Sequence, residues 1–502
     1  MLTKNPIIMK PVKTLQSLFI TSEAYPLIKT GGLADVAGSL PPAIASLKPT
    51  RHHPSVEQRI LLPGYRQVLE QLKDSQIITE ITQTNHKGAI RLLESRLPGT
   101  DIVLWVVDAP DCFDRDGGPY SDNSGQDWPD NAWRFTVFCQ AAVTIALDQA
   151  GLDWRPDIVH CNDWQTGLVP ALLAPHATRP TTLFTIHNLA YQGVYSSDTF
   201  FSLSLPHSLW TMDGLEYYGN MAFIKGGLAY SDWLTTVSPT YAQEIQSPDF
   251  GFGLDGLLRH RAEQLSGIIN GIDTTEWDPV TDTALVKNYD IEHFADKAIN
   301  KTALQKELNL PVSANTPILA FIGRLVWQKG IDVLLDALPD LLQSDIQCVI
   351  LGSGDSNEEQ RLNELVAQFP DKLATYIGYD EPLAHRIEAS ADMFCMLSRY
   401  EPCGLNQLYS LRYGTVPIVR RTGGLADSVV DAREGARGTG FVFDHTTKDD
   451  FMVAMHRALE RYKHQKQWQA LAKRGMRRDF SWKQSARHYL DLYIRLHRQR
   501  HP

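Results

Sequence analysis

The sequence lacks the features that would place it in a membrane or in an oxidising compartment. No window reaches the roughly 18 apolar residues of a membrane helix, and the N-terminal segment has no apolar core of about 7 to 15 residues, as a secretory signal would. Six cysteines are scattered along the chain: Cys112, Cys139, Cys161, Cys348, Cys395 and Cys403. None lies in a Cys-x-x-Cys pair or at zinc-like spacing, so we expect free thiols, no metal site and a cytoplasmic protein.

Positive charge is also scarce. The 502 residues include 48 Lys and Arg against 58 Asp and Glu, which gives a formal net charge of −10. No long run of Lys or Arg interrupts this balance, which argues against a nucleic-acid or anionic-membrane surface. We therefore expect any positive site to be local, and we expect neither nucleic acid nor membrane among the partners.

The hydrophobic pattern predicts an α/β protein. Short apolar runs rich in β-branched residues alternate with longer amphipathic stretches, which is typical of parallel sheets covered by helices. The expected strands of the first half are 17–22, 59–63, 101–108, 156–162, 181–187, 233–238 and 266–271. Those of the second half are 317–323, 346–353, 373–378, 391–398, 415–420 and 440–444.

Two strand series of similar length predict two domains, since 502 residues exceed one ordinary core. The first series ends at "IINGID", and a polar connection with Pro279 precedes the next helix. We expect an N-terminal α/β domain over 1–275, a second over 276–485, and a C-terminal helix over 486–502 that needs a surface to cover, for which we expect the first domain. Ligands of such sheets bind beyond the carboxyl ends of the strands, so we expect the domains to face each other across a deep cleft.

The tetrapeptide Gly-Gly-Leu-Ala occurs three times, at 31–34, 226–229 and 423–426. Each copy is expected to begin a helix, where paired glycines allow close approach to a backbone or a ligand. The first copy follows Lys29 and the first strand, and we expect it to contact a ligand. We expect the second copy, after Lys225, to have a structural role. For the third, after Arg421, contact with a nucleotide and simple packing both stay open.

The segment "FIGRLVWQKGID" places Arg324 and Lys329 between a buried strand and a helix. Backbone N–H groups, the helix dipole and two side-chain charges then converge, which makes a strong anion site. The alternative is a solvated loop with two surface cations. A second glycine loop, "LGSGD", follows the next strand and favours the anion site, for which phosphate is the natural ligand.

Glu401 follows the strand expected at 391–398, and Gly404 is expected to begin the next helix. A carboxylate repels phosphate, so Glu401 should contact a different part of the ligand. The hydroxyl groups of a sugar are the simplest candidate.

Further runs complete the pattern: "ITSEAYPLIKTGGLADV", "HCNDWQTGL", "TIHNLAYQG", "TVSPTYAQEI", "INGID" and "SRYEPCGLNQLYSLRYGTVPIVRRTGGLADSV". Together, from about residue 17 to 485, they resemble the bacterial glycogen synthases, the ADP-glucose-dependent glycogen and starch synthase family. The resemblance implies a retaining glycosyltransferase of the GT-B fold, with two Rossmann-like domains. It would transfer glucose from ADP-glucose to the non-reducing 4-hydroxyl of an α-1,4-glucan and elongate glycogen, with no metal or other cofactor.

The resemblance also implies two sets of site residues. The catalytic set comprises Glu401, His187, Arg324, Lys329 and Asp163. The substrate-binding set comprises Lys29, Gly31, Gly32, Asn270, Tyr379, Cys403, Gly404, Leu405, Asn406 and Tyr120.

In the donor part of these sets, Arg324, Lys329 and Lys29 correspond to contacts with the diphosphate. Glu401 corresponds to the carboxylate that holds the glucosyl hydroxyls, and Tyr379 to the aromatic residue that stacks on adenine.

In the sugar part, His187 and Asp163 correspond to residues that line the glucose subsite. Asn270 corresponds to another glucose or phosphate contact, and Tyr120 to a position that contacts the acceptor glucan.

Three positions depart from the family pattern. Position 409 is Tyr, where the wider enzyme class has a second Glu. Position 406 is Asn, where many relatives have Thr, so we assign the phosphate contact to the backbone N–H groups of 404–406. Asn162 and Gln165 replace two His found in some members, which leaves their roles open.

Three chemical routes are compatible with these residues. In a covalent route through Cys403, the thiol would lack a His partner. In a double displacement, Asp163 or Glu401 would be the nucleophile, as in the glycosidases. The resemblance favours a front-face route, in which the leaving phosphate accepts the proton of the acceptor. The protein then stabilises the departing diphosphate and positions the sugar.

Other functions remain to be distinguished. The same fold could use UDP-glucose or another nucleotide sugar, or could bind glucan without activity. A phosphorylase-like enzyme would need a pyridoxal-phosphate lysine and a longer chain. A Rossmann oxidoreductase would need Gly-x-Gly-x-x-Gly after the first strand, and "KTGGLADVAG" does not have that spacing. The oligomeric state stays open.

Overall fold

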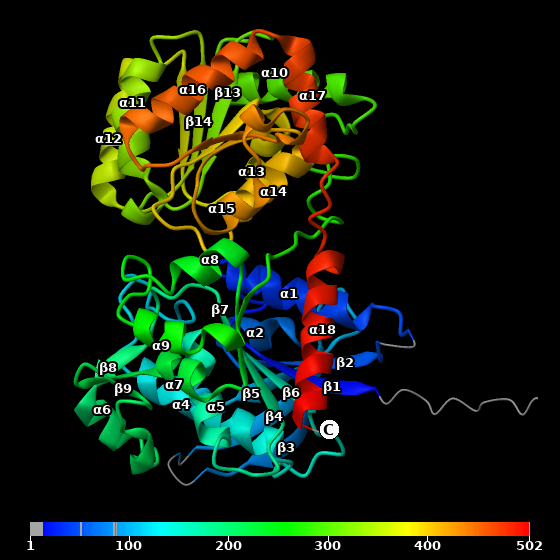
Figure 1. The fold of residues 1–502 in the computed structure, drawn as a ribbon, viewed down its shortest axis with the longest axis vertical. Coiled ribbons are helices and arrows are strands. Elements are labelled where there is room, and N and C mark those ends of the chain that lie inside the picture. The colour runs from blue at the N-terminus through cyan, green and yellow to red at the C-terminus, as the bar shows by residue number, and fades with distance from the viewer. Residues whose placement is uncertain (1–13, 51–52, 84–85, 87, 501–502) are drawn as a thin grey trace, which may run out of the picture. The chain divides into compact units, whose positions relative to one another are not determined.

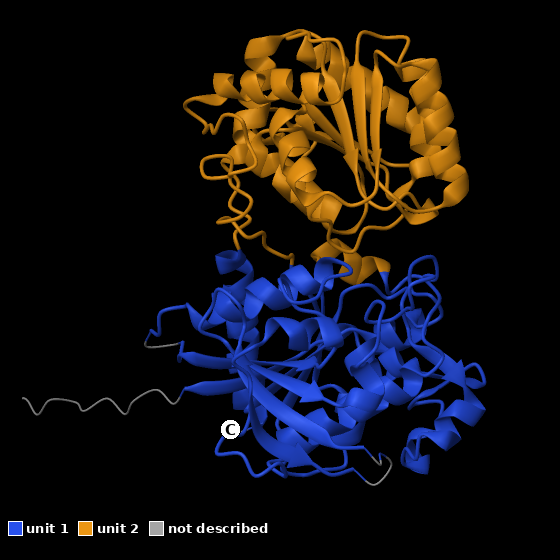
Figure 2. Cartoon of the chain, turned by 180° about the vertical axis from the view of Figure 1, so that it is seen from behind, with its two compact units in different colours: residues 1–236, 245–268, 482–502 blue, residues 237–244, 269–481 orange. Residues whose placement is uncertain are grey.

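The computed structural model describes residues 14–50, 53–83, 86 and 88–500. It divides into two compact units, coloured blue and orange in Figure 2. Unit 1 comprises the described residues of 1–236, 245–268 and 482–502, and unit 2 comprises 237–244 and 269–481.

The unit boundaries differ from those expected by several residues. The chain passes into unit 2 after residue 268 and leaves it after 481, where the sequence suggests 275 and 485. Residues 269–275 belong to unit 2 because the N–H of Ile272 donates to the carbonyl of Phe480 (2.8 Å) and Ile272 forms a parallel bridge with Ser481. Residues 237–244 belong there as well, because Thr240 donates to the Asp427 carboxylate from its N–H (2.9 Å) and its hydroxyl (2.7 Å).

A nine-stranded sheet forms the centre of unit 1, in the order β12-β11-β7-β6-β1-β2-β5-β4-β3 (Figure 1). The parallel strands are β1 (Leu15–Ile20), β2 (Val56–Pro63), β5 (Val103–Asp108), β6 (Ile158–Asn162), β7 (Thr181–Ile186), β11 (Trp233–Thr236) and β12 (Leu265–Gly267). The antiparallel edge consists of β3 (Gln76–Ile81) and β4 (Ile90–Arg96). A small antiparallel sheet holds β8 (Val194–Ser196), β10 (Asn220–Ala222) and β9 (Glu216–Tyr217).

The parallel strands form because both of their faces are covered. Every residue of β7 is buried, as are Leu18, Phe19 and Ile20 of β1. Strands buried on both faces read as continuous apolar runs, which is why they were predictable from the sequence. In β3, by contrast, most residues are exposed or half-buried.

Nine helices cover the described part of unit 1. They are α1 (Gly32–Ala45), α2 (Arg66–Gln71), α3 (Pro110–Phe113), α4 (Asn131–Ala146), α5 (Leu168–Leu173), α6 (Ser197–Ser202), α7 (Phe223–Tyr230), α9 (Asp255–His260) and α18 (Trp482–Arg500). The terminal helix α18 packs against α1, and the Tyr493 hydroxyl lies 2.7 Å from Nδ1 of the buried His160 on β6. Helix α18 thereby contributes to the core of unit 1.

Unit 2 contains a six-stranded, wholly parallel sheet in the order β15-β14-β13-β16-β17-β18. Its strands are β13 (Ile318–Ile322), β14 (Gln347–Gly352), β15 (Leu373–Ile377), β16 (Met393–Met396), β17 (Val416–Arg420) and β18 (Phe441–Phe443). Its helices are α8 (Pro239–Glu244), α10 (Lys297–Glu307), α11 (Ile331–Leu341), α12 (Ser356–Gln368), α13 (Glu381–Ser390), α14 (Asn406–Tyr413), α15 (Gly423–Ser428), α16 (Lys448–Tyr462) and α17 (Gln465–Met476). This strand order is that of a Rossmann domain, with the order reversing between β13 and β16.

Alternate strand residues of unit 2 feed two hydrophobic cores. On β13, Leu319 and Phe321 join the core beneath α11, α14, α16 and α17. Ile318 and Ala320 join the opposite core beneath α10, α13 and α15. The period of two along the strand therefore fixes both layers of helices on one sheet.

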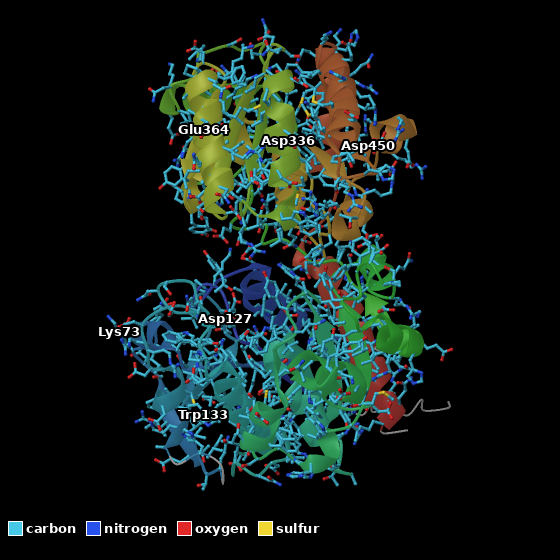
Figure 3. All side chains as sticks on the ribbon, turned by 90° about the vertical axis from the view of Figure 1, so that its left-hand side faces the viewer. Lys73, Asp127, Trp133, Asp336, Glu364 and Asp450 are labelled. Atoms are coloured by element: carbon cyan, nitrogen blue, oxygen red, sulfur yellow. The ribbon has the colours of Figure 1, made fainter. Side chains whose placement is uncertain are left out.

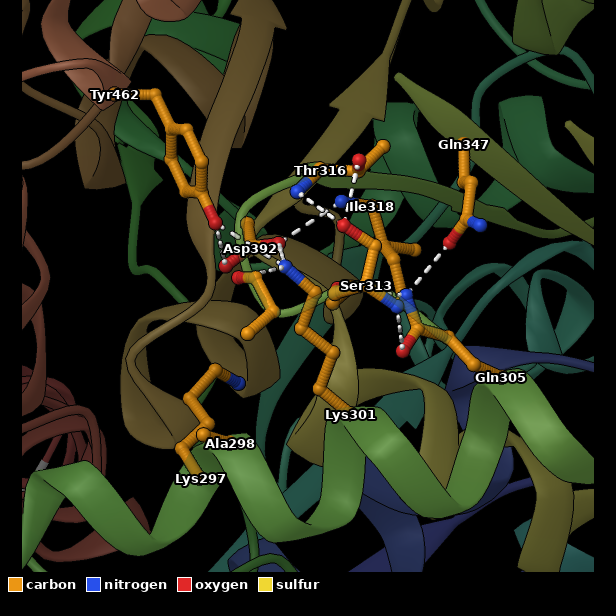
Figure 4. Close-up of polar contacts among 12 residues, drawn as sticks. Lys297, Ala298, Lys301, Gln305, Ser313, Thr316, Ile318, Gln347, Asp392 and Tyr462 are labelled. Carbon is orange, nitrogen blue, oxygen red and sulfur yellow. Dashed lines mark hydrogen bonds and ion pairs between the residues drawn. The ribbon is translucent and has the colours of Figure 1, made fainter. Parts of the chain in front are cut away.

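A buried polar network joins α10 to the sheet of unit 2 (Figure 4). The Lys301 ammonium donates to Oδ2 of Asp392 (2.8 Å) and to the Tyr462 hydroxyl (3.1 Å). The same Asp392 oxygen accepts the N–H of Ile318 (2.9 Å). Removing one partner of such a buried pair typically costs about 3 to 5 kcal/mol, so this network specifies how α10 seats on β13 and β16.

Charged side chains lie on the outer faces of the helices, as Asp336 on α11 and Glu364 on α12 show in Figure 3. None of the described helices is long and apolar enough to cross a membrane.

Candidate active site

Lys329 and Glu401 come together at the switch point of the unit 2 sheet. Lys329 ends the 3-10 turn Trp327–Lys329 that follows β13, and Glu401 follows the neighbouring strand β16. The Lys329 ammonium lies 2.6 Å from Oε2 of Glu401. Open α/β sheets bind their ligands at this point, so the pair stands where a ligand is expected.

Gly330 allows the Lys329 loop to approach the strand that carries Glu401. Its φ is 69°, in the left-handed region, and an added Cβ would lie 2.4 Å from the carbonyl oxygen of Leu397. A residue with a Cβ at this position would therefore require the Lys329 loop or the backbone at Leu397 to shift.

The Glu401 loop is held by its own neighbours and by the third Gly-Gly-Leu-Ala copy. Ser398 Oγ donates to Oε2 of Glu401 (2.8 Å), and the Glu401 carbonyl accepts the N–H of Gly424 (3.1 Å). A Cβ on Gly423, whose φ is 42°, would lie 1.9 Å from that carbonyl oxygen. Packing beneath the Glu401 loop is thus the role that the third copy has in this structure.

Two carboxylates absent from the predicted sets fasten α15 to α8. Glu244 accepts the hydroxyl of Thr422 (2.9 Å) and the N–H of Gly423 (3.1 Å), and burial raises its pKa. Asp427 accepts both donors of Thr240. Both carboxylates lie in runs of the family pattern, Glu244 in "TVSPTYAQEI" and Asp427 directly after the third Gly-Gly-Leu-Ala copy, but the pattern assigned them no role.

Arg324 lies in the same loop as Lys329 and is exposed. Its Nη2 donates to Oε1 of Gln328 (3.2 Å), and Gln328 in turn donates to the carbonyl of Tyr400 (3.3 Å). Asn406 Nδ2 donates to the carbonyl of Ile322 at the end of β13 (2.8 Å). These bonds join the loops after β13 and β16, and they engage the Asn406 side chain with protein.

The segment from Cys403 to Leu405 leads into α14, and one detail of the expectation is wrong. The helix begins at Asn406 rather than Gly404, whose φ of 73° lies in the left-handed region. Cys403 is buried, and burial raises the pKa of its thiol to about 12, so it is not a thiolate nucleophile at neutral pH. Asn270 is also buried, and its Oδ1 accepts no hydrogen bond from the described residues.

Tyr379 carries the most exposed tyrosine ring among the predicted residues. The side chain is 75% exposed, and its hydroxyl donates to Oε2 of Glu381 (2.9 Å) at the start of α13. The ring is therefore accessible for stacking while its hydroxyl is anchored.

In unit 1, Asp163 and His187 follow the neighbouring strands β6 and β7 and contact each other. Asp163 Oδ1 accepts the backbone N–H groups of His187 (2.8 Å) and Asn188 (3.3 Å). The φ and ψ of Asp163 are 57° and 179°, a region that costs a residue other than glycine about 1 to 3 kcal/mol. Burial raises the pKa of Asp163 to about 7.

His187 is neutral in this setting, because burial lowers its pKa to about 3. The amide nitrogen of Asn162 donates to the carbonyl of Ile20 (3.0 Å), so its Oδ1 accepts from Nε2 of His187 (3.0 Å). The Nε2–H tautomer leaves a lone pair on Nδ1 that can accept a hydroxyl proton. Asn162, whose role the sequence left open, orients this imidazole.

Glu23 is absent from both predicted sets and organises the loop that carries Lys29. It is 3% exposed and lies three residues after the end of β1. It accepts the N–H (2.6 Å) and hydroxyl (2.6 Å) of Thr30 and the N–H of Gly31 (3.2 Å). The predicted acceptor residue Tyr120 donates its hydroxyl to Oε1 of Glu23 (2.5 Å). An acidic residue between a buried strand and a glycine loop was the signal that could have identified it.

Lys29 pairs within its own motif. Its ammonium lies 2.8 Å from Oδ1 of Asp35 in the first turn of α1, and 5.3 Å from the ring centroid of Tyr25. A Cβ on Gly31 would meet nothing within 4 Å, so space around this residue is open.

The second Gly-Gly-Leu-Ala copy lies inside α7 rather than at its start, which corrects the expectation for this copy. The helix begins at Phe223, and a Cβ on Gly227 would lie 2.4 Å from the Phe184 ring of β7. Lys225 is buried and donates to the carbonyl oxygens of Met212 (2.6 Å) and Glu216. It serves the structure of unit 1.

The predicted residues thus fall into groups. Unit 2 brings together Lys329, Glu401, Arg324 and the 404–406 segment, with the exposed Tyr379 on the loop after β15. Unit 1 brings Asp163 to His187, and Tyr120 to the Lys29 loop through Glu23. Both groups follow the carboxyl ends of parallel strands.

Comparison with known proteins agrees with this division. Residues 17–260 match the family described as starch synthase catalytic domain, and residues 300–475 match glycosyl transferases group 1. The glycogen synthase of Cellvibrio japonicus is 52% identical over 482 residues, which cover 95% of this chain and 99% of that protein. Glycogen synthase 2 of Nitrosococcus oceani is 50% identical over 483 residues, covering 95% and 97%.

Solved structures show the same fold. The catalytic domain of starch synthase IV from Arabidopsis thaliana, bound to ADP and acarbose, superposes with a TM-score of 0.86 at 32% identity, covering 97% of this chain and 100% of that one. Sucrose-phosphate synthase from Thermosynechococcus elongatus, at 18% identity and a TM-score of 0.58, shares the fold. The chain therefore has the GT-B fold with two Rossmann-like units, and by its identity to these enzymes over nearly its whole length it belongs to the glycogen synthase family of glycosyltransferases.

Proposed function

We propose that this protein transfers glucose from ADP-glucose to the non-reducing 4-hydroxyl of an α-1,4-glucan with retention of configuration, and so elongates glycogen. The Lys329–Glu401 pair at the sheet switch point carries this proposal, in a chain 52% identical to a glycogen synthase. A cation beside a carboxylate suits a ligand that has both phosphate and hydroxyl groups.

The cations of unit 2 bind the diphosphate of the donor. Arg324 presents a guanidinium fork, Lys329 a compact ammonium, and the 404–406 segment presents backbone N–H groups at the start of α14. Such groups stabilise phosphate charge and cost no reorganisation when that charge grows. Glu401, which repels phosphate, accepts hydrogen bonds from the glucosyl hydroxyls.

The reaction proceeds on one face of the sugar. The bond between glucosyl C1 and the phosphate oxygen breaks, its electron pair stays on the phosphate, and the acceptor 4-oxygen bonds to C1. The acceptor proton passes to the leaving phosphate, so no protein nucleophile or base is needed. Lys329 and Arg324 stabilise the charge that develops on the phosphate.

The sugar-binding residues of unit 1 bind or position the sugar, and none of them acts as a nucleophile. The uncharged His187 accepts a glucosyl hydroxyl on Nδ1. Asp163 holds the backbone of residues 187 and 188 and so sets the position of that imidazole. Tyr120 and the Lys29 loop, joined through Glu23, contact the acceptor and the donor respectively.

The adenine preference rests on Tyr379 and on the relatives. An exposed ring with an anchored hydroxyl provides a stacking surface. The Arabidopsis starch synthase was solved with ADP, which supports an adenine nucleotide for this chain as well.

One assay tests the proposal. Purified protein is incubated with glycogen and either ADP-glucose or UDP-glucose, and nucleotide release and the new linkage are measured. We expect ADP release and new α-1,4 bonds. Release mainly from UDP-glucose would overturn the donor assignment, and release from neither donor would indicate a glucan-binding protein without this activity.

A further inference from the structure

Three metal-ligand side chains of unit 2 converge at a place to which the proposed reaction assigns no substrate contact, although one of them also accepts the Tyr379 hydroxyl (2.9 Å). They are Glu276, Glu381 and His385, and one ligand atom of each lies within 4.8 Å of the other two. Glu381 and His385 are four residues apart on α13, so they share a helix face. Glu276 comes from a segment about a hundred residues earlier in the chain, which the fold brings to α13.

His385 is held in one orientation by its surroundings. Its Nδ1 lies 2.8 Å from Oδ2 of Asp282, which also accepts the Tyr413 hydroxyl (2.6 Å). The imidazole stacks on Trp277 with ring centroids 3.7 Å apart and an interplanar angle of 16°. The same packing buries the side chain, which is only 8% exposed. The ring is therefore fixed before any ligand binds.

The remaining nitrogen of this ring is available for an ion. Because Nδ1–H donates to a carboxylate, the neutral ring has its lone pair on Nε2. Nε2 forms no hydrogen bond with any residue that the structure describes. A His that donates one nitrogen to a carboxylate and presents the other to an ion is the usual arrangement of metal-binding histidines.

The electrostatics at this place also favour a cation. A nitrogen lone pair converges with two carboxylates, and the Asp282 carboxylate lies behind the ring. Such acceptors repel one another, and a cation between them would offset this repulsion. The partial positive charge at the start of α13 offsets only about half of one negative charge.

We propose that Glu276, Glu381 and His385 bind one divalent metal ion of the zinc class, with Asp282 as the hydrogen-bonded partner that orients the His. Imidazole nitrogen with carboxylate oxygens suits Zn²⁺ and similar transition metals better than Mg²⁺, which prefers oxygen ligands and water. The ion joins the loop before Trp277 to the first turns of α13. Because the ion links these two segments, its role is to stabilise this part of unit 2.

Calorimetry tests the site on the full-length protein. The chain is treated with EDTA, dialysed and titrated with ZnCl₂, in parallel with Glu276→Gln, Glu381→Gln and the double variant. We expect each single change to weaken the tight Zn²⁺ site by at least about 10-fold, since loss of an outer partner alone costs 10- to 100-fold. The double variant should lose one Zn²⁺ per chain.

Glu307→Gln is the matched control. Glu307, at the end of α10, pairs with Arg386, which follows His385 on α13. Neither Glu307 nor Arg386 belongs to the cluster. This variant should bind Zn²⁺ as the wild type does. Equal stoichiometry and affinity in the wild type and the double variant would overturn the proposal and leave adventitious surface binding.

Cobalt gives a second readout that does not depend on the folding of a variant. In the wild type, Co²⁺ bound through a nitrogen and carboxylate oxygens gives a visible absorption band that Zn²⁺ displaces. The melting temperature should rise with one equivalent of Zn²⁺ and fall again with EDTA. Absence of both the band and the shift in the wild type would overturn the proposal.

Discussion

The Nζ atom of Lys329 lies 2.6 Å from Oε2 of Glu401, so the cation and the anion of the unit 2 site form one pair. The Glu401 side chain is 7% exposed and that of Lys329 22%. A carboxylate this deeply buried depends on its partners, which here are Lys329 and Ser398. The pair keeps both groups in place for a ligand with phosphate and hydroxyl groups.

Replacing Lys329 with Ala should therefore lower kcat by about 10² to 10³, the typical effect of removing one donor to a developing oxyanion. The variant loses the stabilising charge and also leaves Glu401 without its cation. Steady-state rates of ADP release measure the effect. Lys463→Ala is the control, because Lys463 forms an exposed pair with Glu460 and should retain wild-type rates. A wild-type kcat in Lys329→Ala would refute the role.

Glu23→Gln should disturb the Lys29 loop without disturbing the core. The carboxylate accepts from two backbone N–H groups and two hydroxyls, whereas an amide of the same shape turns two donors toward some of them. Each buried donor left without a partner costs about 1 to 3 kcal/mol, so kcat/KM should fall by about 5- to 150-fold.

Separate KM values for donor and glycogen show where the Glu23 effect acts, and we expect the donor KM to rise. Glu57→Gln, at a surface pair with Arg59, is the control. Unchanged kinetics in Glu23→Gln would show that the loop does not depend on this carboxylate.

The parallel sheets were predictable from the sequence because most of their strands are buried on both faces. β7 and β13, for example, lie within one or two residues of the expected runs 181–187 and 317–323. The edge strands β3 and β4 and the small sheet of β8, β9 and β10 were not predicted. Their residues are short runs with many half-buried or exposed side chains, so the apolar signal is weak.

The candidate site was predictable where a residue follows a buried strand. Lys329 and Glu401 satisfy this condition. Asp163 and His187 also follow buried strands, but the resemblance identified them. Glu244 was not predictable in this way, because its partners Thr422 and Gly423 lie almost 180 residues away and only the fold brings them together. The resemblance, and not spacing, supplied Tyr120 and Tyr379.

The two outer Gly-Gly-Leu-Ala copies should respond differently to alanine. In Gly424→Ala the new Cβ would lie 2.0 Å from the Cys403 carbonyl oxygen, so the Glu401 loop must shift. Overpacking of this kind costs about 1 to 3 kcal/mol or more. Gly31→Ala meets nothing within 4 Å and has an extended backbone, so its melting temperature should stay near that of the wild type. Calorimetry measures the melting temperatures of both variants. Equal losses of melting temperature in the two variants would contradict the different roles of the two copies.

Chelation should leave the initial rate unchanged. The charges that we assign to the diphosphate come from Arg324, Lys329 and backbone N–H groups, so we expect the transfer to need no metal. Rates with and without EDTA, well below the melting temperature, measure this. Removal of an ion from Glu276, Glu381 and His385 should lower the melting temperature instead. A rate abolished by EDTA and restored by a divalent cation would contradict the mechanism.

Asp163 should make unit 1 less stable as pH rises. Its folded pKa of about 7 exceeds the ordinary value of 3.8, so the folded state binds a proton that the unfolded state has released. Stability from this group is complete below about pH 4 and is lost as pH rises through 7. At about 1.36 kcal/mol for each pKa unit, the full change is on the order of 4 kcal/mol.

Asp163→Asn isolates the effect of this carboxyl group, because its Oδ1 can still accept the N–H groups of His187 and Asn188 while its charge is gone. Melting temperatures of the wild type and the variant are compared between pH 4 and pH 8. The neighbouring His187 contributes in the opposite direction in both proteins, since its lowered pKa removes stability as pH falls below 6.5, and it cancels in the difference. The wild type should therefore lose stability relative to Asp163→Asn as pH rises, and a constant difference would show that Asp163 is ionised throughout.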